Sequence, residues 1–375
     1  MGFRAGVTLQ GDETVSVGHK SGETSQGVQA VSVGYNSGQI GQNSFSIAIG
    51  SNAGQSIQGT SSVAVGIDAG QISQGAQSVS VGYQSGQTSQ GTKTTAIGYQ
   101  CGQTSQGDKS VSIGYECGKT SQGIQSIAMG YRSGHDTQLQ QSVAIGHQSG
   151  MTSQGSQSVA IGLNAGQTGQ NTESVAIGFQ CGQTSQGSQS VAVGYECGEL
   201  GHNNQSVAMG HQAGKNGQAS QCIAIGFQAA INDQEFQSVA IGYTAGANYQ
   251  NNTAVAIGIA AGKDYQGTGC THVGFGSGEY QRTNLSAMSN GRGQGACGFG
   301  MLSGQYTQNA YAVAIGSRAG ERAQRYGAVS LGHRAGRNIQ SSYSVALGFR
   351  AGEGTDNGGG SWTRGIGDRA IIINA

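Results

Sequence analysis

The sequence contains no proline, and only 10% of its 375 residues are charged. It has one tryptophan, and no run of apolar residues approaches the length that a membrane-spanning helix needs. Because it lacks both proline and a three-residue period, a collagen-like triple helix is excluded, although glycine occupies 70 positions. The seven cysteines form no CxxC pair, so the sequence indicates neither a disulfide framework nor a zinc site. We therefore expect folding in a reducing compartment.

What the sequence does have is a repeat of sixteen residues. A glycine recurs at every sixteenth position from Gly2 to Gly274 without insertion or deletion. The phase then slips, with Ser289 taking the place of the glycine, and the period resumes at Gly300. A longer final step leads to Gly367. The regularly placed Val and Ile residues argue against a disordered tract, because a disordered segment has no reason to keep them in phase.

Sixteen residues are too few for a pair of helices, but they fit one coil of a parallel β-solenoid with two short strands and two tight turns. The three residues before the repeat glycine alternate large, small and large, as in Val191-Ala192-Val193. A period of two is typical of a strand with one buried face, so we expect the large residues to form the core. The small residues then form a column that lets another surface approach closely. We therefore expect the solenoid to pack sideways against copies of itself.

The sequence predicts an all-β parallel β-solenoid of about 23 coils. We divide it into a regular solenoid at residues 1–281, a phase-slipped, Arg-rich continuation at 282–352, and a closing segment at 353–375. Residues 1–281 hold 8 Lys and Arg against 14 Asp and Glu, whereas residues 282–375 hold 10 Arg against 4 acids. These opposite charges favour end-to-end assembly or an acidic partner, although drift in an exposed column explains them equally well.

Two columns of like residues are candidates for a further role. A glutamine stands eight residues after the repeat glycine, and stacked amides can form a hydrogen-bonded ladder between coils. The predicted structural ladder consists of Gln74, Gln90, Gln106, Gln122 and Gln186. An aromatic residue often follows the repeat glycine, and it forms either a structural stack or a surface that binds sugars or a host receptor. The candidate surface-binding column consists of Tyr83, Tyr99, Tyr115 and Tyr131.

The pattern of reactive side chains does not indicate an enzyme. Cys101 and Cys117 share one column in adjacent coils, and we interpret them as small buried thiols, because parallel Cβ vectors disfavour a disulfide. The histidines of the aromatic column lie too far apart to share a metal; they are His19, His147, His211 and His333. Carboxylates are scattered singly, and no Ser-His-Asp grouping is indicated. We expect no catalytic residues, no cofactor and no metal.

The repeats resemble a known family. Units such as QSVAIG, of the SVAIGYQAG type, are similar to the head repeats of trimeric autotransporter adhesins, which build a left-handed parallel β-roll. Similar tandem repeats, often ending in an IIINA-like segment, occur in fibre proteins of large DNA viruses and phages. The resemblance covers Gly2 to Gly348, and the C-terminal AIIINA adds to it. It implies a homotrimer of left-handed β-rolls that acts as a fibre or head.

The sequence departs from the adhesins in lacking a recognisable secretion signal, coiled-coil stalk and membrane anchor. We therefore place first a non-enzymatic structural or adhesive fibre protein, on the virion or cell surface, assembled in a reducing compartment. A bacterial trimeric adhesin head, an extracellular filament and, last, an ice-binding solenoid are the alternatives. The expected partners are copies of the chain and a host receptor or glycan, with no nucleic acid and no membrane insertion. Met1 stands in the column of Ile49, which leaves open that the sequence is a fragment.

Overall fold

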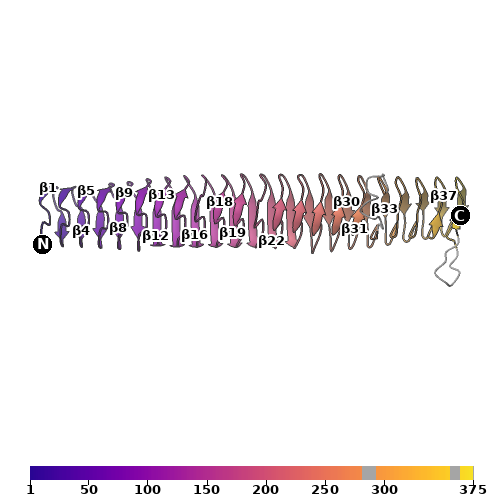
Figure 1. The fold of residues 1–375 in the computed structure, drawn as a ribbon, viewed down its shortest axis with the longest axis horizontal. Coiled ribbons are helices and arrows are strands. Elements are labelled where there is room, and N and C mark those ends of the chain that lie inside the picture. The colour runs from indigo at the N-terminus through magenta and orange to yellow at the C-terminus, as the bar shows by residue number, and fades with distance from the viewer. Residues whose placement is uncertain (281–292, 355–363, 375) are drawn as a thin grey trace. The chain divides into compact units, whose positions relative to one another are not determined.

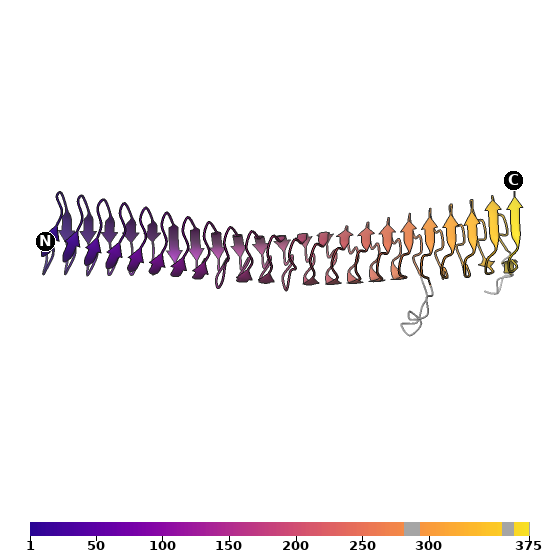
Figure 2. The ribbon, with the colours of Figure 1, turned by 90° about the horizontal axis from the view of Figure 1, so that it is seen from above.

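The computed structural model describes residues 1–280, 293–354 and 364–374. The chain divides into two compact units, Met1–Gln189 (unit 1) and Ser190–Ala375 (unit 2). Within each unit, successive coils of a parallel β-solenoid follow one another (Figures 1 and 2). The described residues make about 20 coils with a repeat of about 16 residues, so the predicted all-β parallel β-solenoid is confirmed. The domain boundaries predicted from the sequence stay predictions.

A regular coil contributes one short strand to each of two sheets. Strands that end at the ladder glutamine or its equivalent form what we call the Gln sheet. In unit 1 these are β1 (Thr8–Gln10), β3 (Thr24–Gln26), β5 (Ile40–Gln42), β7 (Ser56–Gln58), β9 (Ile72–Gln74), β11 (Thr88–Gln90), β13 (Thr104–Gln106), β15 (Thr120–Gln122), β18 (Thr152–Gln154) and β20 (Thr168–Gln170). In unit 2 they are β23 (Leu200–His202), β25 (Asn216–Gln218), β27 (Asn232–Gln234), β29 (Asn248–Gln250), β31 (Asp264–Gln266) and β36 (Ile339–Gln340), the last paired with β38 (Arg364–Ile366).

Strands that precede the repeat glycine, or run through it, form what we call the Val sheet. In unit 1 these are β2 (Val15–Val17), β4 (Val31–Val33), β6 (Ile47–Ile49), β8 (Val63–Val65), β10 (Val79–Val81), β12 (Thr95–Tyr99), β14 (Val111–Tyr115), β16 (Ile127–Tyr131), β17 (Val143–His147), β19 (Val159–Leu163) and β21 (Val175–Phe179). In unit 2 they are β22 (Val191–Tyr195), β24 (Val207–His211), β26 (Ile223–Ile225), β28 (Val239–Ile241), β30 (Val255–Ile257), β32 (Thr271–Val273), β33 (Cys297–Phe299), β34 (Val313–Ile315), β35 (Val329–Leu331), β37 (Val345–Gly348) and β39 (Ile371–Asn374).

The register stacks each residue on its equivalent in the next coil. In the Gln sheet Gln106 pairs with Gln122, and in the Val sheet Gly98 pairs with Gly114. At Gly98 φ is +124°, and a Cβ atom there would lie 1.9 Å from the carbonyl oxygen of Gly114. Because the coils approach so closely at this point, only glycine fits the repeat position where another coil follows.

The prediction that the large Val and Ile residues form the core is wrong. The second residue of each strand in the Val sheet points inward, and Ala96, for example, is fully buried. Its neighbour Ile97 is 37% exposed. The interior has no room for larger residues because the buried glutamines already cross it: a Cβ atom at Gly134 would lie 2.8 Å from Gln138 Oε1 and 3.3 Å from Ala128 Cβ. The core therefore consists of small residues packed around glutamine side chains.

The phase slip also differs from the prediction. Ser289 lies outside the described residues, but β32 pairs directly with β33, Thr271 opposite Cys297. The step from Gly274 to Gly300 is therefore one coil of 26 residues and not two short coils. The last step has the same length, because Gly348 pairs with Asn374. Asn374, and not Gly367, therefore occupies the repeat position.

Candidate functional site

The outer side of the Val sheet is apolar. The first and third residues of each strand point outward, as does the residue that follows the repeat glycine, because side chains alternate along a strand. We call these three columns the apolar face. The exposed members in unit 1 are Phe3, Val15, Val17, Tyr35, Ile49, Ile67, Tyr83, Ile97, Tyr99, Tyr115, Tyr131, Leu163 and Ile177. Strand spacings give the face of unit 1 an area of about 700 Å², which exceeds the largest apolar patch of a typical monomer.

The four tyrosines predicted as a surface column lie along one edge of this face. Their rings stack with centroid separations of 5.2 Å, 4.9 Å and 5.1 Å from Tyr83 to Tyr131. His147 continues the stack at 4.8 Å from Tyr131. The rings are about 40% exposed, so each presents an edge and little of its face to solvent. This geometry favours contact with a second apolar surface over stacking of a sugar on a ring face.

The aromatic column of unit 2 is built in the same way. Tyr195, His211, Phe227 and Tyr243 stack with centroid separations of 4.8 Å, 4.8 Å and 5.0 Å. The histidines of these columns therefore act as stacked rings. No cluster of three metal-ligating side chains occurs in residues 1–280, 293–354 and 364–374.

The five predicted ladder glutamines lie in one buried column of unit 1. Each donates from its Nε2 to a carbonyl oxygen of the Val sheet across the interior; for example, Gln74 Nε2 lies 2.9 Å from Val63 O. Direct amide hydrogen bonds join some neighbouring coils, as from Gln90 to Gln106 at 3.1 Å. Elsewhere a serine hydroxyl takes part, as between Ser112 and Gln122. All five glutamines therefore make a hydrogen bond to the Val sheet, whereas direct hydrogen bonds between successive glutamines join some neighbouring coils.

Two buried histidines of unit 2 were missed by the sequence analysis. His202 occupies a ladder position, where its ring is fully buried and neither ring nitrogen makes a hydrogen bond within the described residues. Burial lowers its pKa to about 4. The Oε1 atom of Gln218 in the next coil is also buried without a partner among these residues. A histidine eight residues after the repeat glycine was the signal that could have identified this site.

His272 continues the glutamine column through the 26-residue coil between Gly274 and Gly300. Gln266 Nε2 donates to its Nδ1 and its Nε2 donates to Gln308 Oε1, both at 3.1 Å. These partners require the neutral ring, and burial lowers the pKa of His272 to about 4. The next coil has Gly298 in place of the usual alanine, because a Cβ atom there would lie 2.8 Å from His272 Cδ2. The sequence shows a large residue at His272 and a glycine at the equivalent position in the next coil, Gly298. It does not show that the histidine ring needs the space that this glycine leaves.

The seven cysteines, all within the described residues, are thiols that form no disulfide, and six of them are buried. Cys101 Sγ and Cys117 Sγ each donate to a glycine carbonyl of the next coil, at 3.0 Å and 2.9 Å. Burial raises the pKa of Cys270 to about 11. A thiol in this state is a poor nucleophile, and the contacts of Cys101 and Cys117 are those of small core residues.

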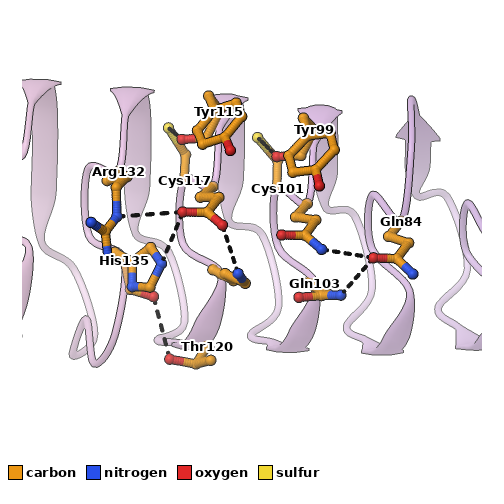
Figure 3. Close-up of polar contacts among 12 residues, drawn as sticks. Gln84, Tyr99, Cys101, Gln103, Tyr115, Cys117, Thr120, Arg132 and His135 are labelled. Atoms are coloured by element: carbon orange, nitrogen blue, oxygen red, sulfur yellow. Dashed lines mark hydrogen bonds and ion pairs between the residues drawn. The ribbon is translucent and has the colours of Figure 1, made fainter.

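The corner between the two sheets carries polar columns. Gln103 Nε2 donates to Gln84 Oε1 at 3.1 Å, and two coils further along, Arg132 lies 3.4 Å from Glu116 Oε2 (Figure 3). A hydrogen bond from Lys119 holds the pKa of Glu116 below its usual value. These contacts are partly exposed, so they stabilise the corner only slightly.

Two copies of the YadA head domain repeat match residues 140–165, a segment that contains β17, β18 and β19. A search of curated proteins finds no match. The chain therefore contains head repeats of the trimeric autotransporter adhesin type within its β-solenoid, and the predicted resemblance is confirmed. These repeats are structural elements of non-enzymatic adhesins. Within the described part of the chain, no helix has the length and hydrophobicity needed to cross a membrane.

Proposed function

We propose that the protein is the head of a cell-surface adhesin, in which three copies of the chain pack with their apolar faces together. The observation that carries this proposal is the continuous apolar face. In unit 1 alone its area of about 700 Å² is close to the 800 Å² that each partner contributes to a standard protein interface. Proteins of the matched family are typically trimeric, which supports three copies over two.

Sideways association of the chains was also expected from the sequence, but the physical reason for it is now a different one. Sideways packing was expected on columns of small residues, which the structure places in the core. The large residues left outside offer a stronger reason for association, because their burial removes apolar surface from water. The tyrosine column lies within the proposed interface, so we assign it a structural role there and no role in sugar binding.

The family match supports a cell-surface location and an adhesin more than the virion fibre that the sequence analysis placed first. No feature of the described residues favours the virion fibre specifically. Head repeats present long surfaces with many equivalent positions, so binding by an adhesin of this kind would gain from avidity.

The test is the molar mass of the full chain by light scattering, compared with that of a doubly substituted chain. We expect three times the 37.8 kDa of one chain. Ile97→Asp with Ile177→Asp places charges on the apolar face at positions that are both 37% exposed, and should yield monomers. A matched control is Ser105→Asp, which adds a charge to the exposed outer side of the Gln sheet, where another coil already has Asp233.

The control variant should keep the mass of the unmodified chain. Circular dichroism of all samples shows whether the coils remain folded. A wild-type chain that is monomeric at every concentration would refute the proposal, as would a double aspartate variant that associates as tightly as the wild type.

A further inference from the structure

A column of arginines runs along one corner of unit 2. Arg318, Arg334 and Arg350 each stand two residues after the repeat glycine in three consecutive coils. Their backbones are in register, because Arg334 N donates to Ser317 O and Arg350 N donates to His333 O, both at 2.9 Å. The Cα atoms of adjacent arginines are therefore about one strand spacing apart, about 4.8 Å. We call these three residues the Arg column.

The charge of the Arg column is not balanced by the residues around it. Residues 293–354 contain six arginines and only two acids, Glu321 and Glu353. Glu353 is shared by three arginines, since it also pairs with Arg337 at 3.3 Å. Arg318 has no ion pair in the described residues, and Arg334 Nε has no hydrogen-bond partner there.

Like charges stacked in register repel one another and destabilise the coils that carry them. In the remaining coils this position is mostly neutral, as at Gln84, Gln100, Gln148 and Gln228. A bound anion would remove this repulsion, and guanidinium groups match carboxylate and sulfate oxygens in pairs.

We propose that the Arg column binds an extended anionic polysaccharide whose acidic groups are carboxylates or sulfates. The spacing of one positive charge per coil is close to the length of one sugar unit, so successive charges can meet successive sugars. Arg350 packs 5.4 Å from the centre of the Phe349 ring at the edge of the apolar face, a contact that helps to hold its guanidinium group in place. This inference rests on the proposed adhesin role, for which it names a class of ligand.

A polysaccharide fits this surface better than a nucleic acid. The three charges form a single line, whereas duplexes and single strands are bound by broad basic patches or grooves. The other source of carboxylates is a second copy of the chain, bound through its acidic residues. The experiment distinguishes such self-association from binding of a polysaccharide.

The experiment measures binding of the full chain at low salt to a heparin oligosaccharide, to an oligogalacturonate and to a neutral maltooligosaccharide, by titration calorimetry. The test variant carries Arg318→Gln, Arg334→Gln and Arg350→Gln, which places in the column the residue that other coils already have. The matched control is Arg132→Gln, a substitution at the same place in a coil of unit 1, where the arginine is paired with Glu116.

We expect binding of one or both acidic oligosaccharides, weakening with added salt, and an affinity at least about tenfold lower in the triple variant. The control should bind as the wild type does, and the neutral sugar should not bind. The relative affinities for the sulfated and the carboxylated sugar distinguish the two anions.

Three results would overturn the proposal: no binding of either acidic sugar, equal binding by the triple variant, or salt-sensitive self-association that the triple substitution abolishes without any sugar. Light scattering of the same samples shows whether the trimer is intact. Failure of sugar binding in an intact trimer would therefore contradict this inference and leave the proposed assembly standing.

Discussion

Replacing His202 with glutamine is expected to stabilise unit 2. The histidine is fully buried, its two ring nitrogens make no hydrogen bond within the described residues, and Gln218 Oε1 beside it is in the same state. Elsewhere in the unit the amide of one coil donates to the next, as from Gln218 to Gln234 at 2.9 Å. A glutamine at residue 202 would donate to Gln218 Oε1 in the same way. Satisfying buried polar atoms is worth about 1–3 kcal/mol, so the gain at pH 7 should be of that order.

The effect should be larger in acid. Burial lowers the pKa of His202 and of His272 to about 4, below their unfolded value of about 6.5. The unfolded chain then binds protons that the folded chain cannot, so stability falls as the pH drops from 6.5 towards 4. Each histidine should remove about 2 kcal/mol between pH 7 and pH 5. The wild type should therefore lose about 4 kcal/mol, and His202→Gln about half of that.

Hydrogen exchange is the appropriate assay, because coils of a solenoid can open separately and one global unfolding transition is not assured. Exchange of the amides in residues 198–218 should slow in His202→Gln at pH 7 after correction for intrinsic rates, and the difference from wild type should grow at pH 5. His333→Gln is the control, because its ring is exposed. Faster exchange in His202→Gln at pH 7, or an unchanged pH dependence, would refute the reasoning.

Four further substitutions in unit 1 test the packing of the coils. Gly98→Ala should cost about 3 kcal/mol or more, since its Cβ would overlap the next coil, whereas Gly41→Ala, whose Cβ would meet nothing closer than 3.8 Å, should cost only about 1–2 kcal/mol, because its backbone is left-handed (φ +67°); thermal unfolding compares them. Gln90→Leu should cost about 2–4 kcal/mol by leaving Val79 O and Gln106 Oε1 without their donor, and faster amide exchange around residue 90 would show it. Cys101→Ala should change the melting temperature little. In the folded wild-type protein, the buried thiol of Cys101 should resist alkylation.

The period of the sequence predicted the fold because stacking in register is the only arrangement that gives every sixteenth residue the same surroundings. The glycine column shows this directly, since Gly98 pairs with Gly114 as the spacing requires. The side on which the large residues lie could not be predicted in the same way. A period of two shows that the faces differ, but it does not show which face is inside.

The buried glutamine column decides which face of the Val sheet points into the interior. Its side chains cross from one sheet to the other, as Gln106 does in donating to Thr95 O at 3.1 Å. The long polar residue therefore fills the interior, and the residue beside it is small unless the neighbouring coil makes room, as Gly298 does for His272. Composition points the same way in retrospect, because the interior residue of the Val sheet is small in nearly every coil. A rule that places hydrophobic residues inside was misleading because a buried amide with all its hydrogen bonds made can replace them.

The lack of proline has the same cause as the repeat. Besides the repeat glycine and the glycine four residues later, most regular coils have three further positions with a left-handed backbone, for example Gln100, Ser105 and Lys109, with φ of 51°, 54° and 57°. Proline cannot adopt these angles. The amide groups are in use as well: Gln100 N donates to Tyr83 O and Lys109 N to Thr92 O, both at 2.9 Å. A proline at most positions would remove a bond between coils, so the stacking that repeats the glycine every sixteen residues also excludes proline.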